Sequence, residues 1–237
     1  MRAEHEPAWL LHHRPFQDAS RILEVLTREH GRLSLVARGS RSARSRLKGV
    51  LRPFLPLRLS WVARSELGTL TGAEVRGAPI ALTGDALLCG WYVNELVMHL
   101  VHRHDPQPEV FALYSATIER LRGGGAAPAL REFELELLGL LGFGIDLERD
   151  TATGKPLEPG QAYEYRVEHG PVALAERQGR LVFPGAELIG VRERRFDDPA
   201  VLRAAGRLLR EVIAFHLGGK ELRSRKVLMD MRGPQGP

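Results

Sequence analysis

Residues 21–37 read RILEVLTREHGRLSLVA, two apolar runs on either side of a short polar segment. Arg21–Thr27 is rich in β-branched and apolar residues, and Arg32–Ala37 alternates polar with apolar residues as a half-buried strand does. Between them, Glu29-His30-Gly31 has the composition of a turn, in which Gly31 can adopt a positive φ. The pattern predicts two strands joined by a tight connection.

Three further segments have the composition of short strands. An apolar run at Ala8–His13 is expected to end at Pro15, and Leu67–Val75 closes the set. Leu51–Val62 contains two prolines, which places it at a sheet edge or in a bent strand. Five short strands in about 70 residues predict a small closed barrel, and five strands with one long connection are typical of an OB-fold.

From Thr83 onward the pattern becomes helical. The predicted fold class is therefore α+β: an N-terminal five-stranded OB-fold barrel at residues 1–80, followed by a mainly α-helical domain at residues 81–237. Within the second domain, residues 145–185 are expected to be irregular, with two weak strands at AYEYRV and GRLVF. The helices are expected at Asp85–Val101, Pro108–Leu121, Pro128–Leu141 and Pro199–Leu217.

The composition indicates a globular protein with uneven charge. The chain has 237 residues, 43% of them hydrophobic, and a net charge of +5. Residues 1–80 hold 14 basic and 7 acidic residues, whereas residues 81–237 are slightly acidic. The single cysteine, Cys89, excludes an internal disulfide and a multi-cysteine zinc site. No apolar run reaches the length of a membrane span, so we expect a cytoplasmic protein.

The positive charge gathers in one segment. Between Glu29 and Glu66 there is no acidic residue but there are nine basic ones, densest in ARGSRSARSRLKG at residues 37–49. Lys and Arg at this density suit a polyanion, because each can neutralise one phosphate and release its counterion. The alternative is a solvated loop whose charge only aids solubility. The residues predicted to contact nucleic acid are Arg32, Arg38, Arg41, Arg44, Arg46 and Lys48.

Aromatic side chains near this segment could stack on bases. Single-strand binding grooves combine Lys and Arg for the backbone with aromatics for the bases. Phe16 lies between two predicted strands and is the preferred candidate. For Phe54 and Trp61, packing in the barrel core is the favoured alternative.

No catalytic or metal site stands out. His99, His102 and His104 lie close in sequence but do not share one helix face, and Asp146, Glu148 and Asp150 fall in the irregular region. We therefore predict no enzyme activity, no metal and no cofactor.

Five segments, in order along the chain, resemble the RecO family of bacterial DNA repair proteins. They are LLHHRPFQDASRILEVLTREHGRLSLVARGSR at 10–41, SRLKGVLRPFLPL at 45–57, LLCGWYVNELV at 87–97, PALREFELELLGLLGFGID at 128–146 and HLGGKELRSRKVL at 216–228. The resemblance implies an OB-fold followed by a helical domain, binding of single- and double-stranded DNA, and annealing of complementary strands. It also implies partnership with RecR and with the single-stranded-DNA-binding protein SSB, so that RecA can load, and a place at the nucleoid. An OB-fold RNA-binding or translation-associated module is the alternative that the basic segment alone permits.

The family pattern and this chain differ in one loop. Many relatives hold a four-cysteine zinc site after the third helix, whereas residues 147–170 here contain no cysteine. The loop is therefore expected to be ordered by packing alone.

The third predicted helix suggests a partner site. Arg131 lies beside three apolar residues. An apolar groove with Arg at its rim suits a short acidic peptide that ends in apolar side chains. The SSB tail has this character. The alternative is that the apolar residues are ordinary core. The residues concerned are Leu130, Arg131, Phe133 and Leu137.

Overall fold

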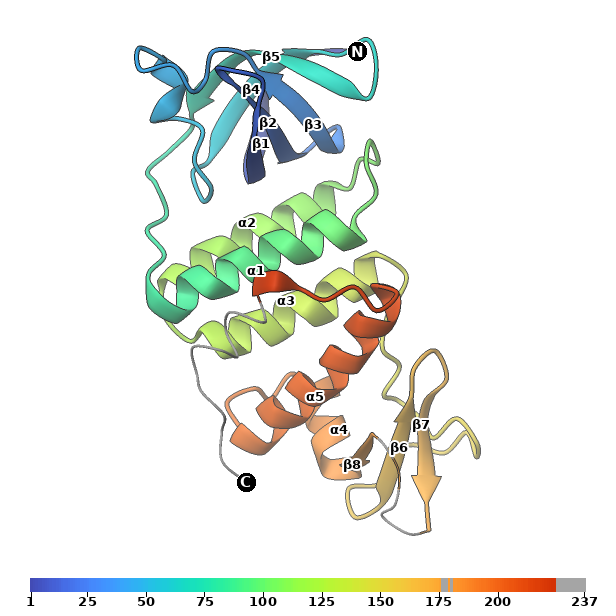
Figure 1. Ribbon diagram of the computed structural model, residues 1–237. Helices are drawn as coiled ribbons and strands as arrows, with labels where there is room; N and C mark the ends of the chain where they lie inside the picture. The colour runs from blue at the N-terminus through green and yellow to red at the C-terminus, as the bar shows by residue number, and fades with distance from the viewer. Residues whose placement is uncertain (176–178, 180, 225–237) are drawn as a thin grey trace. The chain divides into compact units, whose positions relative to one another are not determined.

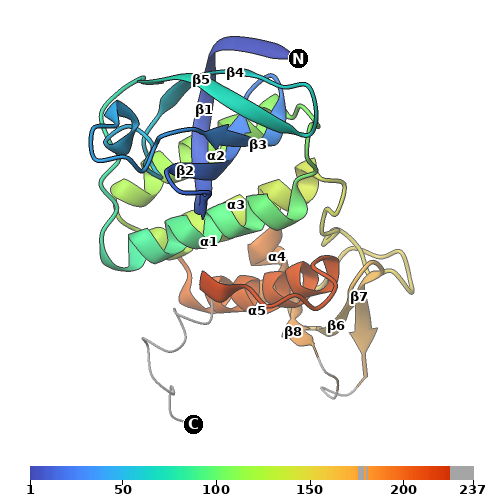
Figure 2. The ribbon, with the colours of Figure 1, turned by 45° about the horizontal axis from the view of Figure 1, so that its top comes forward.

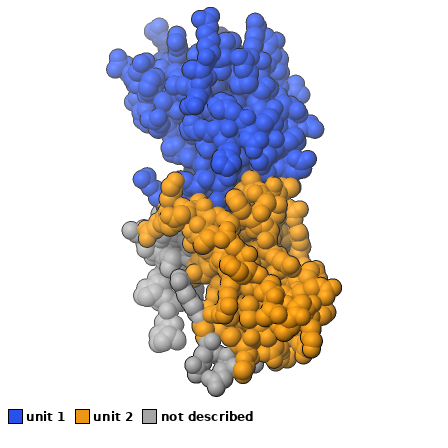
Figure 3. Space-filling model, turned by 90° about the vertical axis from the view of Figure 1, so that its right-hand side faces the viewer, with its two compact units in different colours: residues 1–124, 222–237 blue, residues 125–221 orange. Residues whose placement is uncertain are grey.

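The computed structural model describes residues 1–175, 179 and 181–224, and these form two compact units (Figures 1 and 3). Unit 1 comprises residues 1–124 together with the chain from Leu222, and unit 2 comprises residues 125–221. No helix in the described part of the chain is both long and apolar enough to cross a membrane.

Unit 1 contains a closed five-stranded barrel with the strand order β1-β2-β3-β5-β4 (Figure 2). The β3–β5 pairing is parallel and the others are antiparallel, so the predicted OB-fold barrel is confirmed. Alternate side chains of every strand point inward around the fully buried Trp61, as the two-residue period of a strand requires. The strands are β1 (Arg2–Phe16), β2 (Ser20–Thr27), β3 (Gly31–Ala37), β4 (Leu57–Val62) and β5 (Leu67–Val75).

The β2–β3 hairpin forms as predicted and depends on Gly31. Thr27 pairs with Gly31, and the Thr27 hydroxyl donates to the Gly31 carbonyl at 2.8 Å. Gly31 has a φ of +66°, and a Cβ at this position would lie 2.0 Å from the Asp105 carbonyl oxygen. Glycine is therefore required both by the backbone conformation and by the close approach of the chain beyond the first helix.

Two strand predictions were wrong at their boundaries. β1 runs through Pro15, which pairs with Arg21 of β2. On its other side, β1 pairs with β4 only as far as Ala8. The missing N–H of Pro15 therefore faces an edge that no strand covers. β4 begins only at Leu57 and is paired on both sides rather than at an edge. The chain before it leaves the extended conformation at Phe54, whose φ is +60°.

Helices α1 (Gly84–Leu100) and α2 (Pro108–Arg122) cover part of the outer barrel surface. The Trp9 ring on β1 meets the Tyr114 ring on α2 with centroids 5.5 Å apart, and its indole N–H donates to the Ser115 hydroxyl at 2.8 Å. The compact unit that contains the barrel therefore continues past residue 80, where the strands give way to helices, to Gly124.

A buried amide joins β1 to both helices. The β1–β2 register shifts between Leu10 and His12, so Leu11 is an extra residue in β1 and its carbonyl is not part of the ladder. The Asn94 side chain on α1 donates to this carbonyl at 2.8 Å and accepts from the Tyr114 hydroxyl at 2.6 Å. Burial raises the pKa of Tyr114, which keeps the phenol protonated as a donor.

The end of the described chain returns to unit 1. The Glu95 carboxylate on α1 accepts from the Arg223 and Ser224 amides at 2.9 Å and from the Ser224 hydroxyl at 2.5 Å. The Glu95 carboxylate thus accepts hydrogen bonds from the amides of Arg223 and Ser224 at the start of a helical turn, as a capping residue does.

Unit 2 packs three helices with a small sheet of order β7-β6-β8. The helices α3 and α5 match the predicted ones within two residues, and two strands of the sheet correspond to the predicted AYEYRV and GRLVF segments. β7 and α4 were not predicted, because each is short and contains glycine. The elements are α3 (Ala126–Leu140), β6 (Ala162–Arg166), β7 (Gly170–Leu174), β8 (Val182–Pro184), α4 (Gly185–Arg192) and α5 (Pro199–His216).

The loop after α3 is organised by a carboxylate, not by packing alone. Asp150 is 3% exposed and accepts from the Ala152 amide at 2.9 Å and the Thr153 hydroxyl at 2.8 Å. Burial raises the pKa of Asp150, but hydrogen bonds from Ala152, Thr153 and Ala173 outweigh it, so the pKa lies below its usual value.

Replacing Asn94 by Ala should destabilise the protein by about 3 kcal/mol, because the Leu11 carbonyl and the Tyr114 hydroxyl both lose their partner inside the protein. Tyr114→Phe should cost about 1–2 kcal/mol by leaving only the Asn94 oxygen unpaired. Ser115→Ala is the control, since it removes a hydrogen bond of similar length that is only partly buried. Denaturant unfolding measures all three, and equal losses for Asn94→Ala and Ser115→Ala would contradict a central role for the amide.

Asp150→Asn should lower the melting temperature at pH 7, because the amide cannot replace the charged acceptor. The folded pKa of Asp150 is depressed, so its contribution is present above the unfolded value of about 3.9 and is lost as pH falls through the lower folded value. The difference between variant and parent should therefore vanish in acid. Asp146→Asn, at an exposed carboxylate, is the control. A chelator should leave the parent's melting temperature unchanged, and a large fall would show that a metal organises this loop.

Candidate nucleic-acid interface

The basic connection, residues 38–56 between β3 and β4, is anchored by apolar side chains. Leu51 and Leu55 belong to the buried barrel core, and Leu47 and Val50 pack against it. The Ser40 hydroxyl, also buried, donates to the Ala37 carbonyl at 2.8 Å and closes the first turn. The segment includes one turn of 3-10 helix at Arg46–Lys48. Buried contacts with the barrel core therefore fix the conformation of the basic connection.

Five of the predicted DNA contacts lie together on the outside of this connection. All five are exposed, and no carboxylate in the described part of the chain lies within ion-pair distance of any of them. Charges of one sign without partners produce a local field that attracts an anion. The five residues are Arg38, Arg41, Arg44, Arg46 and Lys48.

The β1–β2 turn, residues 17–19, lies against the basic connection. The Arg41 amide donates to the Ala19 carbonyl at 2.9 Å, and the Arg41 guanidinium approaches the Gln17 carbonyl at 3.4 Å. The structure thus brings Phe16, which is half-buried at the end of β1, to the corner where the cations gather. This is the pairing of aromatic and cationic groups that single-strand binding uses.

The same corner contains basic residues that sequence analysis missed. Arg14 is exposed two residues before Phe16, and Arg21, the second residue of β2, pairs with Pro15. Burial lowers the pKa of His13, and the charges of Arg21 and His12 lower it further. The short distance in sequence between Arg14 and Phe16 could have indicated Arg14. Only the pairing of β1 with β2 places Arg21 beside β1.

Arg32 lies elsewhere. Its side chain is 11% exposed, donates to the Val101 carbonyl at 3.0 Å and pairs with Glu24 at 3.4 Å, and Arg103 pairs with the same carboxylate at 2.9 Å. Burial, followed by the charge of Arg103, lowers the pKa of Arg32 against the opposing effect of Glu24. The structure therefore uses Arg32 to hold β3 to the end of α1.

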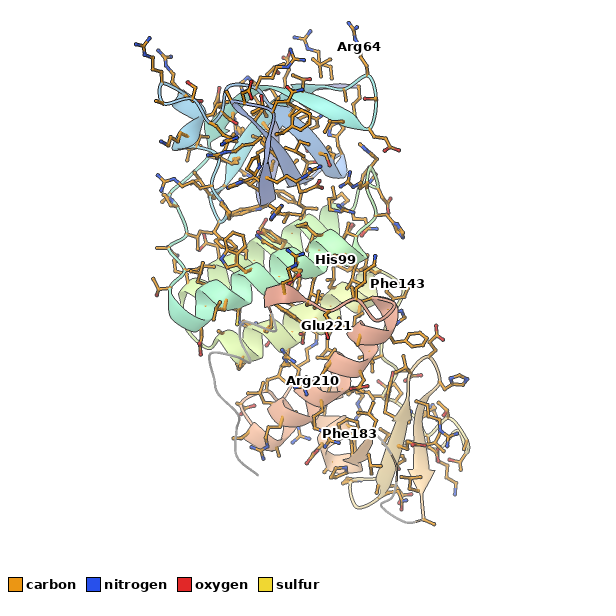
Figure 4. All side chains as sticks on the ribbon, viewed as in Figure 1. Arg64, His99, Phe143, Phe183, Arg210 and Glu221 are labelled. Carbon is orange, nitrogen blue, oxygen red and sulfur yellow. The ribbon has the colours of Figure 1, made fainter. Side chains whose placement is uncertain are left out.

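Phe54 and Trp61 are core residues, which matches the favoured alternative. Trp61 is fully buried. The Phe54 ring packs edge-on to the Trp91 ring of α1, with the ring centroids 5.3 Å apart. On the outer surface of the β2–β3 sheet, Ile22, Leu26 and Val36 are also buried. In many OB-folds this face and the loops beside it bind oligonucleotides. Here exposed cations lie on the strands, at Arg14 and Arg58, and in the connections, including Arg64 in the β4–β5 turn (Figure 4).

The described residues contain no group of three side chains that could hold a metal ion. His99, His102, His104, Asp146, Glu148 and Asp150 do not combine into any group of three potential ligands within the residues that the structure covers. Asp150 organises its own turn, and Glu148 lies 3.5 Å from Arg192.

On α3, the residues predicted for a partner peptide lie mostly inside unit 2. Leu130, Phe133 and Leu137 are buried, and Arg131 pairs at 3.1 Å with the buried Glu134. Another face of α3 forms a shallow groove of about 300 Å³, here called the α3 groove, with an apolar floor and charged rim. It is lined by Leu135, Glu136, Gly139, Leu140, Gly144, Ile145, Leu147, Val191, Arg192 and Arg194.

A closed OB barrel with exposed, unpaired cations beside an aromatic residue defines a class of protein, the OB-fold nucleic-acid-binding proteins. Comparison with known families is more specific. The family model described as recombination protein O N terminal matches residues 1–78, and the one described as recombination protein O C terminal matches residues 81–226. The chain belongs to the RecO family, whose members act in DNA repair and recombination.

Individual relatives agree over nearly the whole chain. The DNA repair protein RecO of Nitrosococcus oceani is 42% identical over 234 residues, covering 98% of this chain and 95% of the relative. That of Methylococcus capsulatus is 41% identical over 221 residues, covering 93% and 90%. That of Coxiella burnetii is 41% identical over 223 residues, covering 94% and 96%.

Proposed function

We propose that this protein is a mediator of recombinational repair that binds single- and double-stranded DNA and anneals complementary strands. Together with RecR it would help to load RecA on single-stranded DNA coated with SSB. The observation that carries the proposal is the basic connection, whose five exposed cations have no carboxylate partner in the described chain and whose Arg41 contacts the turn that follows Phe16. Such work would take place in the cytoplasm, at the nucleoid.

The proposed mechanism of annealing is charge neutralisation. Two complementary strands repel each other through their phosphates, and a surface of guanidinium groups lowers this repulsion by replacing the counterions. Contacts of this kind position a strand without reading its sequence, so pairing between the strands supplies the specificity. No residue needs to make or break a bond, and we therefore assign no catalytic step.

Replacing Arg38, Arg41, Arg44 and Arg46 by Ala should weaken binding to single-stranded DNA of any sequence. Each lost phosphate contact should reduce the slope of log affinity against log salt concentration by about 0.7, so the total reduction should approach 3. Fluorescence anisotropy with a labelled oligonucleotide at several salt concentrations measures the slope. Because the four side chains are exposed, the variant should melt like the parent.

The control removes the same charge elsewhere in unit 1, with Arg2, Arg28, Arg76 and Arg122 replaced by Ala. All four are exposed, and three of them pair with a neighbouring glutamate. An equal loss of slope in both variants would mean that net charge, not the basic connection, binds DNA. Preference for structured RNA over single-stranded DNA in competition would instead support an RNA-binding or translation-associated role.

The SSB tail is the second proposed partner, and the α3 groove fits it better than the surroundings of Arg131. An acidic peptide with an apolar end needs a cation beside a pocket that excludes water. In the α3 groove, Leu135, Ile145 and Val191 offer the apolar surface while Arg192 and Arg194 form the rim. Around Arg131 the apolar residues are already buried, and the guanidinium compensates the buried Glu134.

Arg194→Glu should reduce the affinity for an SSB tail peptide at least tenfold, because it places a carboxylate beside Glu136 on the groove rim. Arg195→Glu is the matched control: the residue is adjacent and exposed, but it does not line the groove. Isothermal titration calorimetry with the peptide measures both. Loss of binding in Arg131→Gln but not in Arg194→Glu would place the peptide at Arg131, as the sequence first indicated.

A further inference from the structure

Helix α5 has three arginines on one face, Arg203, Arg207 and Arg210, here called the α5 row. Side chains three and four residues apart share a helix face, and at about 1.5 Å per residue the row extends along about 10 Å of the helix axis. All three side chains are exposed. The apolar side of the helix, which includes Leu208 and Val212, is buried. The row therefore presents charge to solvent on the side of α5 away from its buried residues.

The cations of the α5 row are poorly compensated within the fold. Arg203 and Arg210 have no ion pair in the described part of the chain. The Arg207 guanidinium lies 4.8 Å from the centroid of the Phe183 ring of β8 and donates to the Val182 carbonyl at 3.2 Å, contacts that orient it without neutralising it. The only carboxylate on α5 is the half-buried Glu211.

A fourth guanidinium lies close to the row. Gly206, on the same helix face between Arg203 and Arg210, has no side chain, and a Cβ there would lie 3.4 Å from the Arg131 guanidinium. Like charges three or four residues apart on a helix repel each other, and glycine weakens a helix interior. Gly206 leaves room for Arg131, which pairs with the buried Glu134, whereas the repulsion within the row does not help unit 2 to fold and favours binding of an extended anion.

We propose that the α5 row is a second binding track for the phosphate backbone of single-stranded DNA, separate from the basic connection in unit 1. The inference rests on the proposed function, since annealing requires that one protein hold two strands. A nucleic acid is favoured over an acidic peptide because the row offers three successive exposed cations, one for each of several phosphates, whereas the apolar side of α5 is buried. One strand would lie on each unit, so that both are held while they pair.

The test compares two triple variants of the full chain. Arg203, Arg207 and Arg210 are replaced by Ala in the first, whereas the second removes the same charge from unit 2 at Arg149, Arg166 and Arg195, which are exposed and do not line the α3 groove. Binding of a labelled single-stranded oligonucleotide is measured over a range of salt concentrations, and the rate of annealing is measured with two complementary oligonucleotides. Thermal melting checks that both variants are folded.

The row variant should show a salt slope lower by about 2, from three contacts at about 0.7 each, and at least tenfold slower annealing. The control triple should change neither. An unchanged slope in the row variant, or an equal loss in the control, overturns the second track. Loss of SSB tail binding with normal DNA binding in the row variant also overturns it, because the row would then be a peptide site.

The variant of the basic connection separates this inference from the proposed function. If that variant loses DNA affinity while the row variant does not, the second track fails and the proposed function stands. If neither variant loses affinity, the proposed DNA-binding function itself fails.

Discussion

The hydrogen bonds of Asn94 connect the parts of unit 1 on which its surface chemistry depends. An extra residue in β1 leaves the Leu11 carbonyl outside the ladder, and in a buried position such an acceptor is costly unless a donor reaches it. Asn94 on α1 supplies the donor and is itself held by Tyr114 on α2. Barrel and helices therefore satisfy each other's polar groups, and α1 and α2 cannot separate from β1 without exposing unpaired groups in an apolar interface.

This arrangement explains where the cations lie. Because the outer residues of β2 and β3, such as Ile22 and Leu26, are buried, the broad sheet surface that other OB-folds offer to oligonucleotides is not available here in the same way. Most of the exposed cations between residues 38 and 64 are found instead in the connections between strands. The basic connection can present arginines outward because Leu51 and Leu55 fix its other side in the barrel core. Apolar anchors supply the position, and the charged residues remain available for a ligand.

Arginine has two roles in this protein, and its partners distinguish them. Arg32 and Arg131 face largely buried glutamates and compensate charges that would otherwise be costly inside the fold. Arg38, Arg44, Arg203 and Arg210 are exposed and have no such partner in the described part of the chain. The first group stabilises the fold, whereas the second produces a positive field, which we propose attracts a polyanion.

The sequence alone determined the barrel, the long helices and the positions of most exposed cations. Strand alternation, helix periodicity and the absence of acidic residues from 30 to 65 are local patterns, and local patterns survive in a single sequence. β7 and α4 were not predicted, because each is short and its local pattern is weak. The tertiary structure alone decided which arginine is paired, because Glu24 reaches Arg32 and Arg103 from different parts of the chain. It also decided that Leu130 and Phe133 are core while Leu135 lines a groove, since helix periodicity gives the spacing of a face but not what packs against it.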